Sequence, residues 1–244
     1  AAFRIPDFLY ITIASLVSIT VLVPFLAERI GKEDKEEAKR FVRGVFTFFT
    51  LSVGAGSVVA FFLAPLLADV LVPGFSEVQK TTFASITRIL LLSPILLGVS
   101  SILGSVAQTY RKFFVYALAP VIYNVGIILG IVFFSSAGGV LGVAWGVVLG
   151  ASLHLLIQLP IFFSHGFSLG IEVLSWRELT KVISRARPRT IALSASQFSL
   201  IALVAAGSLL AGGSIAIFSF SLNLKTVTLY IIGVSYSIAE FQDR

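Results

Sequence analysis

The sequence predicts an all-α membrane protein, a polytopic bundle of about seven transmembrane helices. The 244 residues are 57% hydrophobic and only 12% charged, whereas an ordinary soluble domain carries about 25% charged residues. The mean hydropathy is +1.00, and apolar runs of about 18 or more residues recur along the chain. This composition excludes a soluble globular domain and a disordered chain. The sequence contains no cysteine, which excludes a disulfide framework and a thiolate metal site.

Seven apolar stretches are long enough to cross the bilayer as helices. They cover approximately residues 8–26, 44–71, 82–109, 115–134, 139–163, 190–210 and 213–241. A β-barrel would need segments of about ten residues with alternating hydrophobicity, and these are absent from the sequence. Since backbone groups in lipid must pair within the protein, we expect helices.

The connections between the stretches alternate in charge. Basic residues gather at positions 28–43, 110–114 and 164–189, whereas the loops at 72–81, 135–138 and 211–212 hold only Lys80. Cytoplasmic loops are the ones enriched in Lys and Arg. We therefore expect Ala1 to begin outside and Arg244 to end in the cytoplasm.

Residues 164–189 predict a boundary between two groups of helices. Arg177, Lys181 and Arg185 follow one another at spacings of four, and the stretch from Phe167 to Thr190 reads as one amphipathic interfacial helix, with Trp176 at headgroup depth. Because no aromatic platform is interleaved with these charges, a membrane surface is the expected partner rather than nucleic acid. We divide the chain into a first helical group (1–163), a cytoplasmic linker (164–189) and two further helices (190–244).

Three cations within or beside the apolar stretches are candidates for substrate binding, because a charge in the bilayer is costly. Lys225 lies about 18 Å into the last stretch, too deep to reach either surface easily. It either faces a hydrated cavity or forms a structural pair. Arg88 lies about two turns from the end of its stretch and could snorkel outward. Arg4 is either an interfacial anchor or a cavity cation.

Uncharged polar residues and glycines within the stretches have two interpretations. Asn124, Asn223, Gln197 and His154 could hydrogen-bond between helices or line a polar lumen, and for His154 a proton relay is a further alternative. Glycines at spacings of four predict close helix packing. They are Gly126 and Gly130 in the fourth stretch, and Gly142, Gly146 and Gly150 in the fifth.

The sequence offers no support for catalysis. It contains no paired carboxylates on one face, no Ser-His-acid set and no phosphate-binding glycine loop, and Asp7 and Asp69 are isolated near helix ends. We therefore expect no enzymatic activity, no catalytic residue, no metal and no cofactor.

Several segments occur in a characteristic order. They are AAFRIPDFLY, VPFLAE, LVPGF, the run from Arg88 to Pro160, ALSASQFSLI and IGVSYSIA. In content and order these segments resemble the MurJ (MviN) lipid II flippases of the multidrug/oligosaccharidyl-lipid/polysaccharide exporter superfamily. The resemblance implies about helices two to eight of a two-lobe transporter of the bacterial inner membrane. The chain also opens without methionine, so we expect an internal segment of a longer protein.

The resemblance implies movement of an undecaprenyl-diphosphate-linked precursor to the outer leaflet by alternating access. A cationic cavity meets the diphosphate in that family, and Arg4 matches a basic position of its second helix. Tyr10 and Ile11 stand where well-studied members carry two arginines, and Lys225 follows Asn223, which aligns with a basic residue of helix eight. Two alternatives stay open. One is a flippase or exporter for another polyprenyl-linked saccharide or amphiphile, and the other is a non-transporting scaffold that docks cell-wall synthesis proteins.

Overall fold

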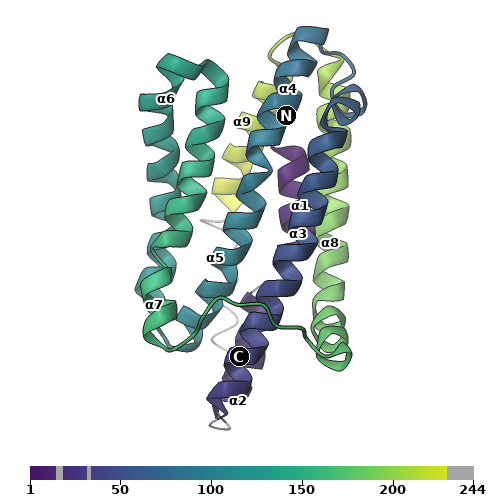
Figure 1. The fold of residues 1–244 in the computed structure, drawn as a ribbon. Helices are drawn as coiled ribbons and strands as arrows, with labels where there is room; N and C mark the ends of the chain where they lie inside the picture. Colours follow the sequence, from purple (N-terminus) through teal and green to yellow (C-terminus); the bar gives the residue numbers. More distant parts are fainter. Residues whose placement is uncertain (15–18, 32–33, 230–244) are drawn as a thin grey trace.

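The computed structural model describes residues 1–14, 19–31 and 34–229, and this part of the chain folds into a bundle of long helices (Figure 1). The helices are α1 (Arg4–Ala14), α2 (Ile19–Gly31), α3 (Lys35–Leu71), α4 (Glu77–Leu90), α5 (Leu92–Thr109), α6 (Phe113–Leu156), α7 (Leu159–Ser164), α8 (Trp176–Ser208) and α9 (Ser214–Thr228). The predicted all-α fold is confirmed. The last predicted stretch, 213–241, and the first, 8–26, lie partly outside the described residues.

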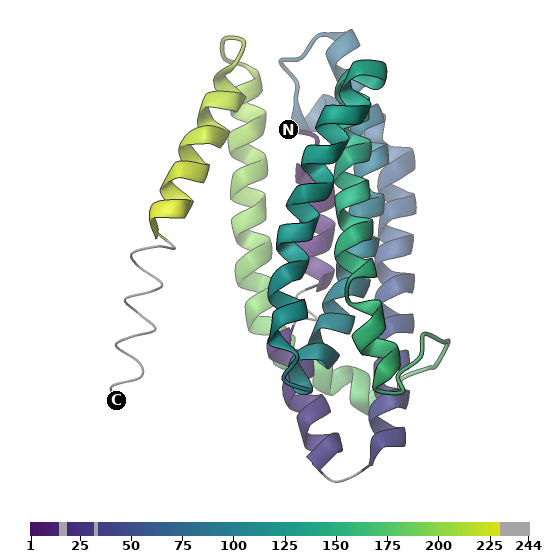
Figure 2. The same ribbon diagram turned by 90° about the vertical axis from the view of Figure 1, so that its left-hand side faces the viewer.

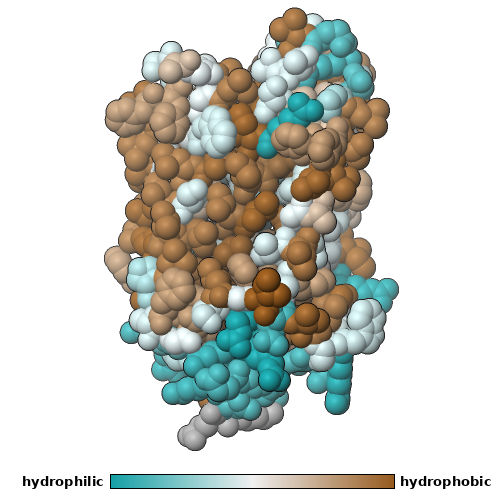
Figure 3. Space-filling view, in the orientation of Figure 1, coloured by the Kyte–Doolittle hydropathy of each residue, from teal (hydrophilic) through white to brown (hydrophobic). Residues whose placement is uncertain are grey.

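Within the part of the chain that the structure describes, four helical stretches are long and apolar enough to span a membrane. They are Lys35–Leu71, Glu77–Thr109, Phe113–Ser164 and Trp176–Ser208. The 52-residue stretch folds back on itself, so it supplies two spans (Figure 1). The connection at 110–112, which holds Arg111 and Lys112, and the connection at 165–175, which leads into the basic first turns of α8, lie at one end of the bundle, together with the end of α2 and the start of α3. We name this the lower end, and the opposite end, with residues 72–76 and 209–213, the upper end. Hydrophilic side chains gather at the lower end in Figure 3, below a broad apolar belt.

Helix α6 is a helical hairpin that turns at Gly139, whose φ of 55° and ψ of −132° lie outside the helical region. The predicted loop at 135–138 is itself helical, so the turn is shorter than expected. Glycines hold the two arms together, because a Cβ atom on Gly130 would lie 2.0 Å from the Cα of Gly146. Gly126 meets Gly150 in the same way, at 2.4 Å. The predicted close packing of these glycine rows is confirmed.

The predicted span at 82–109 is not one continuous helix. It is broken at Leu91 into α4 and α5. Pro94 explains the break, because proline has no N–H to donate to the carbonyl of Leu90 four residues earlier. The sequence predicts that each proline inside a span kinks or breaks its helix, and at Pro94 this prediction is confirmed.

The prediction of an amphipathic helix across the whole linker is partly wrong. Residues 165–174 are not helical, and Gly166 has a φ of 75° that favours glycine. Helix α8 begins at Trp176 after a capping box, in which the Ser175 hydroxyl accepts from the Glu178 N–H and the Glu178 carboxylate accepts from the Ser175 N–H. In Figure 2 the first turns of α8 lie across the lower end, and the helix then turns upward. The division into 1–163, 164–189 and 190–244 stays a prediction.

The core is tightest where α3 meets α5. The ring of Phe49 is fully buried and lies against Gly98, where a Cβ atom would come within 1.7 Å of the ring. Phe41, Leu103 and Phe162 extend the same cluster toward the lower end, and a second cluster around Leu90 and Phe83 lies nearer the upper end. The close approach at Gly98 thus fixes α3 against α5.

Replacing Gly98 with alanine should therefore destabilise the bundle. Overpacking a core typically costs about 1–3 kcal/mol, and the Phe49 ring has no free space to move into. Thermal unfolding in detergent should show a lower midpoint for Gly98→Ala. Gly54→Ala on α3 is the matched control, because its Cβ would meet nothing within 4 Å. Equal stability of the two variants would contradict the packing described for Phe49.

Candidate functional site

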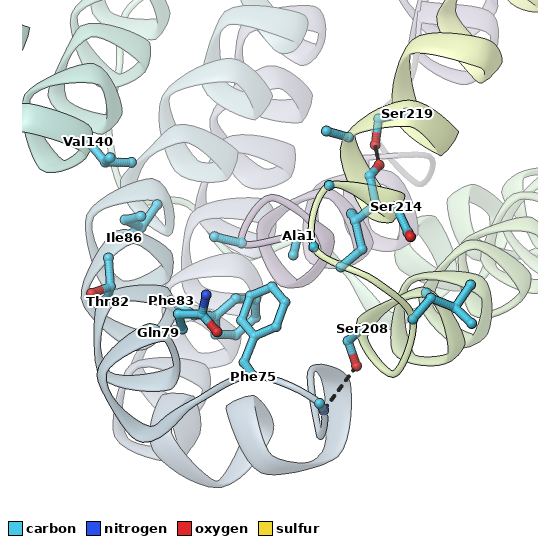
Figure 4. Close-up of a pocket in the computed structure, with 18 of the residues that line it drawn as sticks. Ala1, Phe75, Gln79, Thr82, Phe83, Ile86, Val140, Ser208, Ser214 and Ser219 are labelled. Atoms are coloured by element: carbon cyan, nitrogen blue, oxygen red, sulfur yellow. Dashed lines mark hydrogen bonds between the residues drawn. The ribbon is translucent and has the colours of Figure 1, made fainter.

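A cavity of about 790 Å³ lies near the upper end of the bundle (Figure 4). Its walls come from residues preceding α1, the 72–76 connection, α4, one residue of α6 and the facing ends of α8 and α9. Phe75, Phe83 and Ile86 form an apolar side, and Ser208, Ser214 and Ser219 lie on the other side. The cavity thus joins parts of the chain that the linker separates in sequence.

Two connections touch backbone to backbone beside this cavity. The N–H of Gly74 donates to the Ser208 hydroxyl at 3.2 Å, and that hydroxyl donates to the Ala205 carbonyl at 2.7 Å (Figure 4). A Cβ atom on Gly74 would lie 2.0 Å from the Ser208 carbonyl oxygen. Only glycine fits here, so residue 74 determines how closely the α3–α4 and α8–α9 connections approach.

A smaller cavity of about 40 Å³ lies within the bundle, between α1, α4, α5 and α6. Asp7, Tyr10, Ser93 and Tyr123 supply its polar groups. The Tyr10 hydroxyl hydrogen-bonds to Ser101 at 3.2 Å, while the buried Ser93 hydroxyl has no partner among the described residues. Sequence reasoning dismissed Asp7 as isolated. The available signal was its spacing, because Asp7 lies three residues before Tyr10 and so on the same side of α1.

Arg4 begins α1 directly after Ala1, Ala2 and Phe3, which line the upper cavity. Its side chain is partly buried, and no described carboxylate lies within ion-pair distance of it. Asp7 follows three residues later on the same helix. Arg4 is therefore a cation on the helix that lies between the two cavities.

Lys225 is exposed on α9 and has no ion pair among the described residues. Within that part of the chain α9 packs only against α8, and Figure 2 shows it set apart from α6. Asn223 is also exposed on α9. The structure does not bring Lys225 and Arg4 into direct contact, and both side chains remain available to a ligand.

Arg88 lies elsewhere. It lines an apolar groove formed by α3, α4, α5 and α6 together with Phe61, Phe62 and Trp145. Figures 1 and 2 place α3 and α9 on opposite sides of the bundle. Arg88 is therefore not grouped with Lys225.

The other polar candidates divide between buried and exposed positions. His154 Nδ1 lies 2.7 Å from the Ser100 hydroxyl, and the Gln158 amide donates to the same hydroxyl, which ties α5 to the end of α6. The Asn124 amide donates to the Pro120 carbonyl of its own helix at 2.8 Å. Gln197 is buried on α8, and its Oε1 atom has no partner among the described residues. Of these residues, His154 alone hydrogen-bonds to another helix within the part of the chain that the structure describes.

Paired charges join the elements at the lower end. The Arg29 guanidinium lies 3.0 Å from Glu178 and 3.3 Å from Glu37, and it covers the Phe41 ring at 4.3 Å. Partial burial of the Glu178 carboxyl raises its pKa, but hydrogen bonds from Ser175 and Arg29 outweigh this and hold the pKa below its usual range. Arg29 thereby links α2, α3 and the start of α8.

The sequence is similar to known proteins along almost all of its length. The family model described as "Lipid II flippase MurJ" matches residues 1–241. This chain belongs to the MurJ family. It is therefore a multi-pass membrane protein of a transporter family, as its resemblance to these flippases predicts.

Individual relatives agree with the family match. A protein named probable lipid II flippase MurJ from Buchnera aphidicola subsp. Schizaphis graminum is 28% identical over 246 residues, which cover 98% of this chain and 48% of the relative. The lipid II flippase MurJ of Burkholderia cenocepacia is 28% identical over 243 residues, covering 96% and 47%. The chain thus spans about half the length of the curated MurJ relatives it matches.

A solved structure titled "Lipid II flippase MurJ, inward closed conformation" has the same fold. Its TM-score to this chain is 0.76 at 22% identity, and the match covers 97% of this chain and 50% of the solved one. At this identity the likeness supports the fold alone.

Neutralising Glu178 should weaken the lower end in a pH-dependent way. Because its pKa is lowered in the folded state, its stabilising contribution is present above the unfolded carboxyl pKa of about 4.3 and is lost as pH falls below it. Glu178→Gln should lower the thermal midpoint at pH 7 and have less effect at pH 4. Glutamine can still complete the capping box, so the change removes mainly the charge. In an Arg29→Gln background the effect at pH 7 should shrink, and an unchanged effect would contradict the ion pair.

The contact at Gly74 predicts how the upper end responds to a side chain. Gly74→Val must separate the two connections, because even a Cβ atom overlaps the Ser208 carbonyl. A cysteine introduced at Ser219, in a chain that has no other cysteine, should then react several-fold faster with a polar thiol reagent. Gly212→Val is the control, since a Cβ there meets nothing within 4 Å. If both valine variants accelerate labelling equally, the Gly74–Ser208 contact does not restrict access.

Proposed function

We propose that the chain forms the central part of a flippase that moves lipid II from the inner to the outer leaflet of the bacterial cytoplasmic membrane. The match to the MurJ family across residues 1–241 carries this proposal. The relatives are named as lipid II flippases, and this chain spans about half of each. Its cargo and activity therefore need a test of their own.

The geometry supports alternating access with the upper end closed. Gly74 and Ser208 hold the α3–α4 and α8–α9 connections together there, while the face of α9 that carries Lys225 is uncovered among the described helices. In this proposal the upper end is extracytoplasmic and the lower end cytoplasmic, because Arg111, Lys112 and the basic residues in the first turns of α8 gather at the lower end. Ala1 then begins outside and Arg244 ends inside.

Arg4 and Lys225 are the proposed contacts for the diphosphate. A diphosphate accepts strong charge-assisted hydrogen bonds from such cations, and these bonds offset the cost of moving it through a medium of low dielectric. Arg4 is on the first helix of the chain and Lys225 on the last described one. A ligand between these helices would meet one cation from each side of the linker. Asn223 and Gln197 would supply neutral donors, and Arg88 is left out of this set because it faces the groove of α3 and α6.

Such transport needs no covalent step. The chain would bind and release its cargo in two conformations, so we propose a transporter and not an enzyme, without a cofactor. Its partners would be the lipid-linked precursor and the bilayer, with contacts to cell-wall synthesis proteins as a secondary proposal.

Complementation tests this function. The complete gene product should restore growth to a strain depleted of its own lipid II flippase, and Arg4→Ala or Lys225→Ala should abolish rescue at normal expression. Losing a hydrogen bond to a charged group costs about 1.5–3 kcal/mol, a factor of about 10 to 100 in affinity. Purified protein in vesicles should flip fluorescent lipid II more slowly by a similar factor.

Lys112→Ala is the matched control, since it removes one exposed positive charge at the lower end. It should rescue as well as the native chain, and Arg4→Lys should retain part of the activity. Full rescue by both alanine variants would remove Arg4 and Lys225 from the site. If the native protein neither rescues growth nor flips lipid II while remaining folded, transport itself is rejected in favour of a scaffold.

A further inference from the structure

Arg88 is linked to a gap in the hydrogen bonding of α3. Pro65 lies inside α3 and has no N–H, so it cannot donate to the carbonyl of Phe61 four residues earlier. The Arg88 Nε–H donates to that carbonyl at 3.1 Å, and the guanidinium covers the Phe61 ring at 5.0 Å. One of the five N–H donors of Arg88 therefore substitutes for the missing amide of Pro65.

The charge of Arg88 is not neutralised by any carboxylate in the part of the chain that the structure describes. The acidic residues at the upper end are engaged elsewhere, because Lys80 lies 2.8 Å from Asp69 and 3.1 Å from Glu77. Arg88 is left with an uncompensated charge and with free donors at its Nη atoms.

The surroundings of Arg88 form a groove of about 600 Å³ whose other lining side chains are almost entirely apolar. Its lining includes Phe61 and Phe62 of α3, Leu92 and Ile95 of α5, and Trp145 of α6. Phe62 is 74% exposed and Trp145 49% exposed, so the groove opens to the outside of the bundle. Figure 3 shows the continuous apolar surface of this face.

The depth of Arg88 suits the headgroup region of one leaflet. It follows Lys80 by eight residues, or about 12 Å along α4. An arginine side chain at this depth can reach back toward the headgroups, and it draws polar groups inward. A phosphate can therefore meet the guanidinium while an attached hydrocarbon chain runs along the groove toward the bilayer centre.

We propose that this groove binds an anionic phospholipid of the surrounding bilayer. Its phosphate accepts hydrogen bonds from the free Nη groups of Arg88, and one acyl chain lies between Phe62 and Trp145. Charge complementarity selects the anionic headgroup, because Arg88 has no acidic partner among the described residues. The site is separate from the proposed cargo path, since α3 and α9 lie on opposite sides of the bundle.

Native mass spectrometry of the purified full chain tests the site, with phosphatidylglycerol and phosphatidylcholine as the lipid probes. The native chain should retain at least one phosphatidylglycerol with about a fivefold preference over phosphatidylcholine. Arg88→Gln should abolish this preference while its amide still donates to the Phe61 carbonyl. Arg88→Lys should keep part of it. Val58→Trp, which fills the groove without changing the charge, should lower retention of both lipids.

Arg40→Gln is the control, because it removes an exposed arginine from α3, the helix that carries Phe61 and Phe62. Arg40 lies 21 residues before Phe61, about 30 Å away along the helix. It should leave the lipid preference unchanged. The proposal is overturned if Arg40→Gln reduces the preference as much as Arg88→Gln, since non-specific attraction would then explain it. It is equally overturned if the native chain retains no lipid. Circular dichroism of every variant confirms that it remains helical.

Discussion

The pairing of backbone polar groups inside a bilayer is the constraint on which the rest of this structure depends. Helices satisfy it along most of the chain, and each interruption needs a substitute. Pro65 leaves the Phe61 carbonyl without its amide, and the Arg88 guanidinium supplies the missing donor. Pro94 releases the Leu90 carbonyl, and the span divides there into α4 and α5. The breaks that shape the bundle are thus tied to specific prolines and to the side chains around them.

Close approach of backbones is the second device, and glycine makes it possible. Within α6 it joins two arms of one hairpin, where Gly130 meets Gly146. At the upper end it joins two connections on either side of the linker, where Gly74 meets Ser208. The first contact lies within a single helical hairpin and is extensive, whereas the second rests on one hydrogen bond between loops. A bundle that opens at one end would separate at the second contact and keep the first.

Much of the fold follows from the sequence, because apolar length and the charge of connections are local properties. The spacing of the glycines also predicts close helix packing, because a spacing of four places them on one helix face. Sequence reasoning missed the non-helical start of the linker, where the Glu172 N–H donates to the Thr47 hydroxyl on α3. Asp7 was missed for the same reason, since its polar neighbours Ser93 and Tyr123 come from distant helices. Which residues share a cavity depends on tertiary packing, and spacing along one helix cannot supply it.

Paired charges in this structure join helices to one another, whereas unpaired charges are available to bind an anion. At the lower end Arg29 forms ion pairs with both Glu37 and Glu178, so its charge is neutralised where α2, α3 and α8 meet. Arg4, Arg88 and Lys225 have no described carboxylate partner, although each lies in or beside an apolar helix, where an unpaired charge is costly. Arg4 and Lys225 flank the region between α1 and α9, whereas Arg88 faces the opposite side of the bundle. An anion is the partner that would neutralise each, and its position relative to the bundle decides whether that anion is the transported diphosphate or a resident lipid.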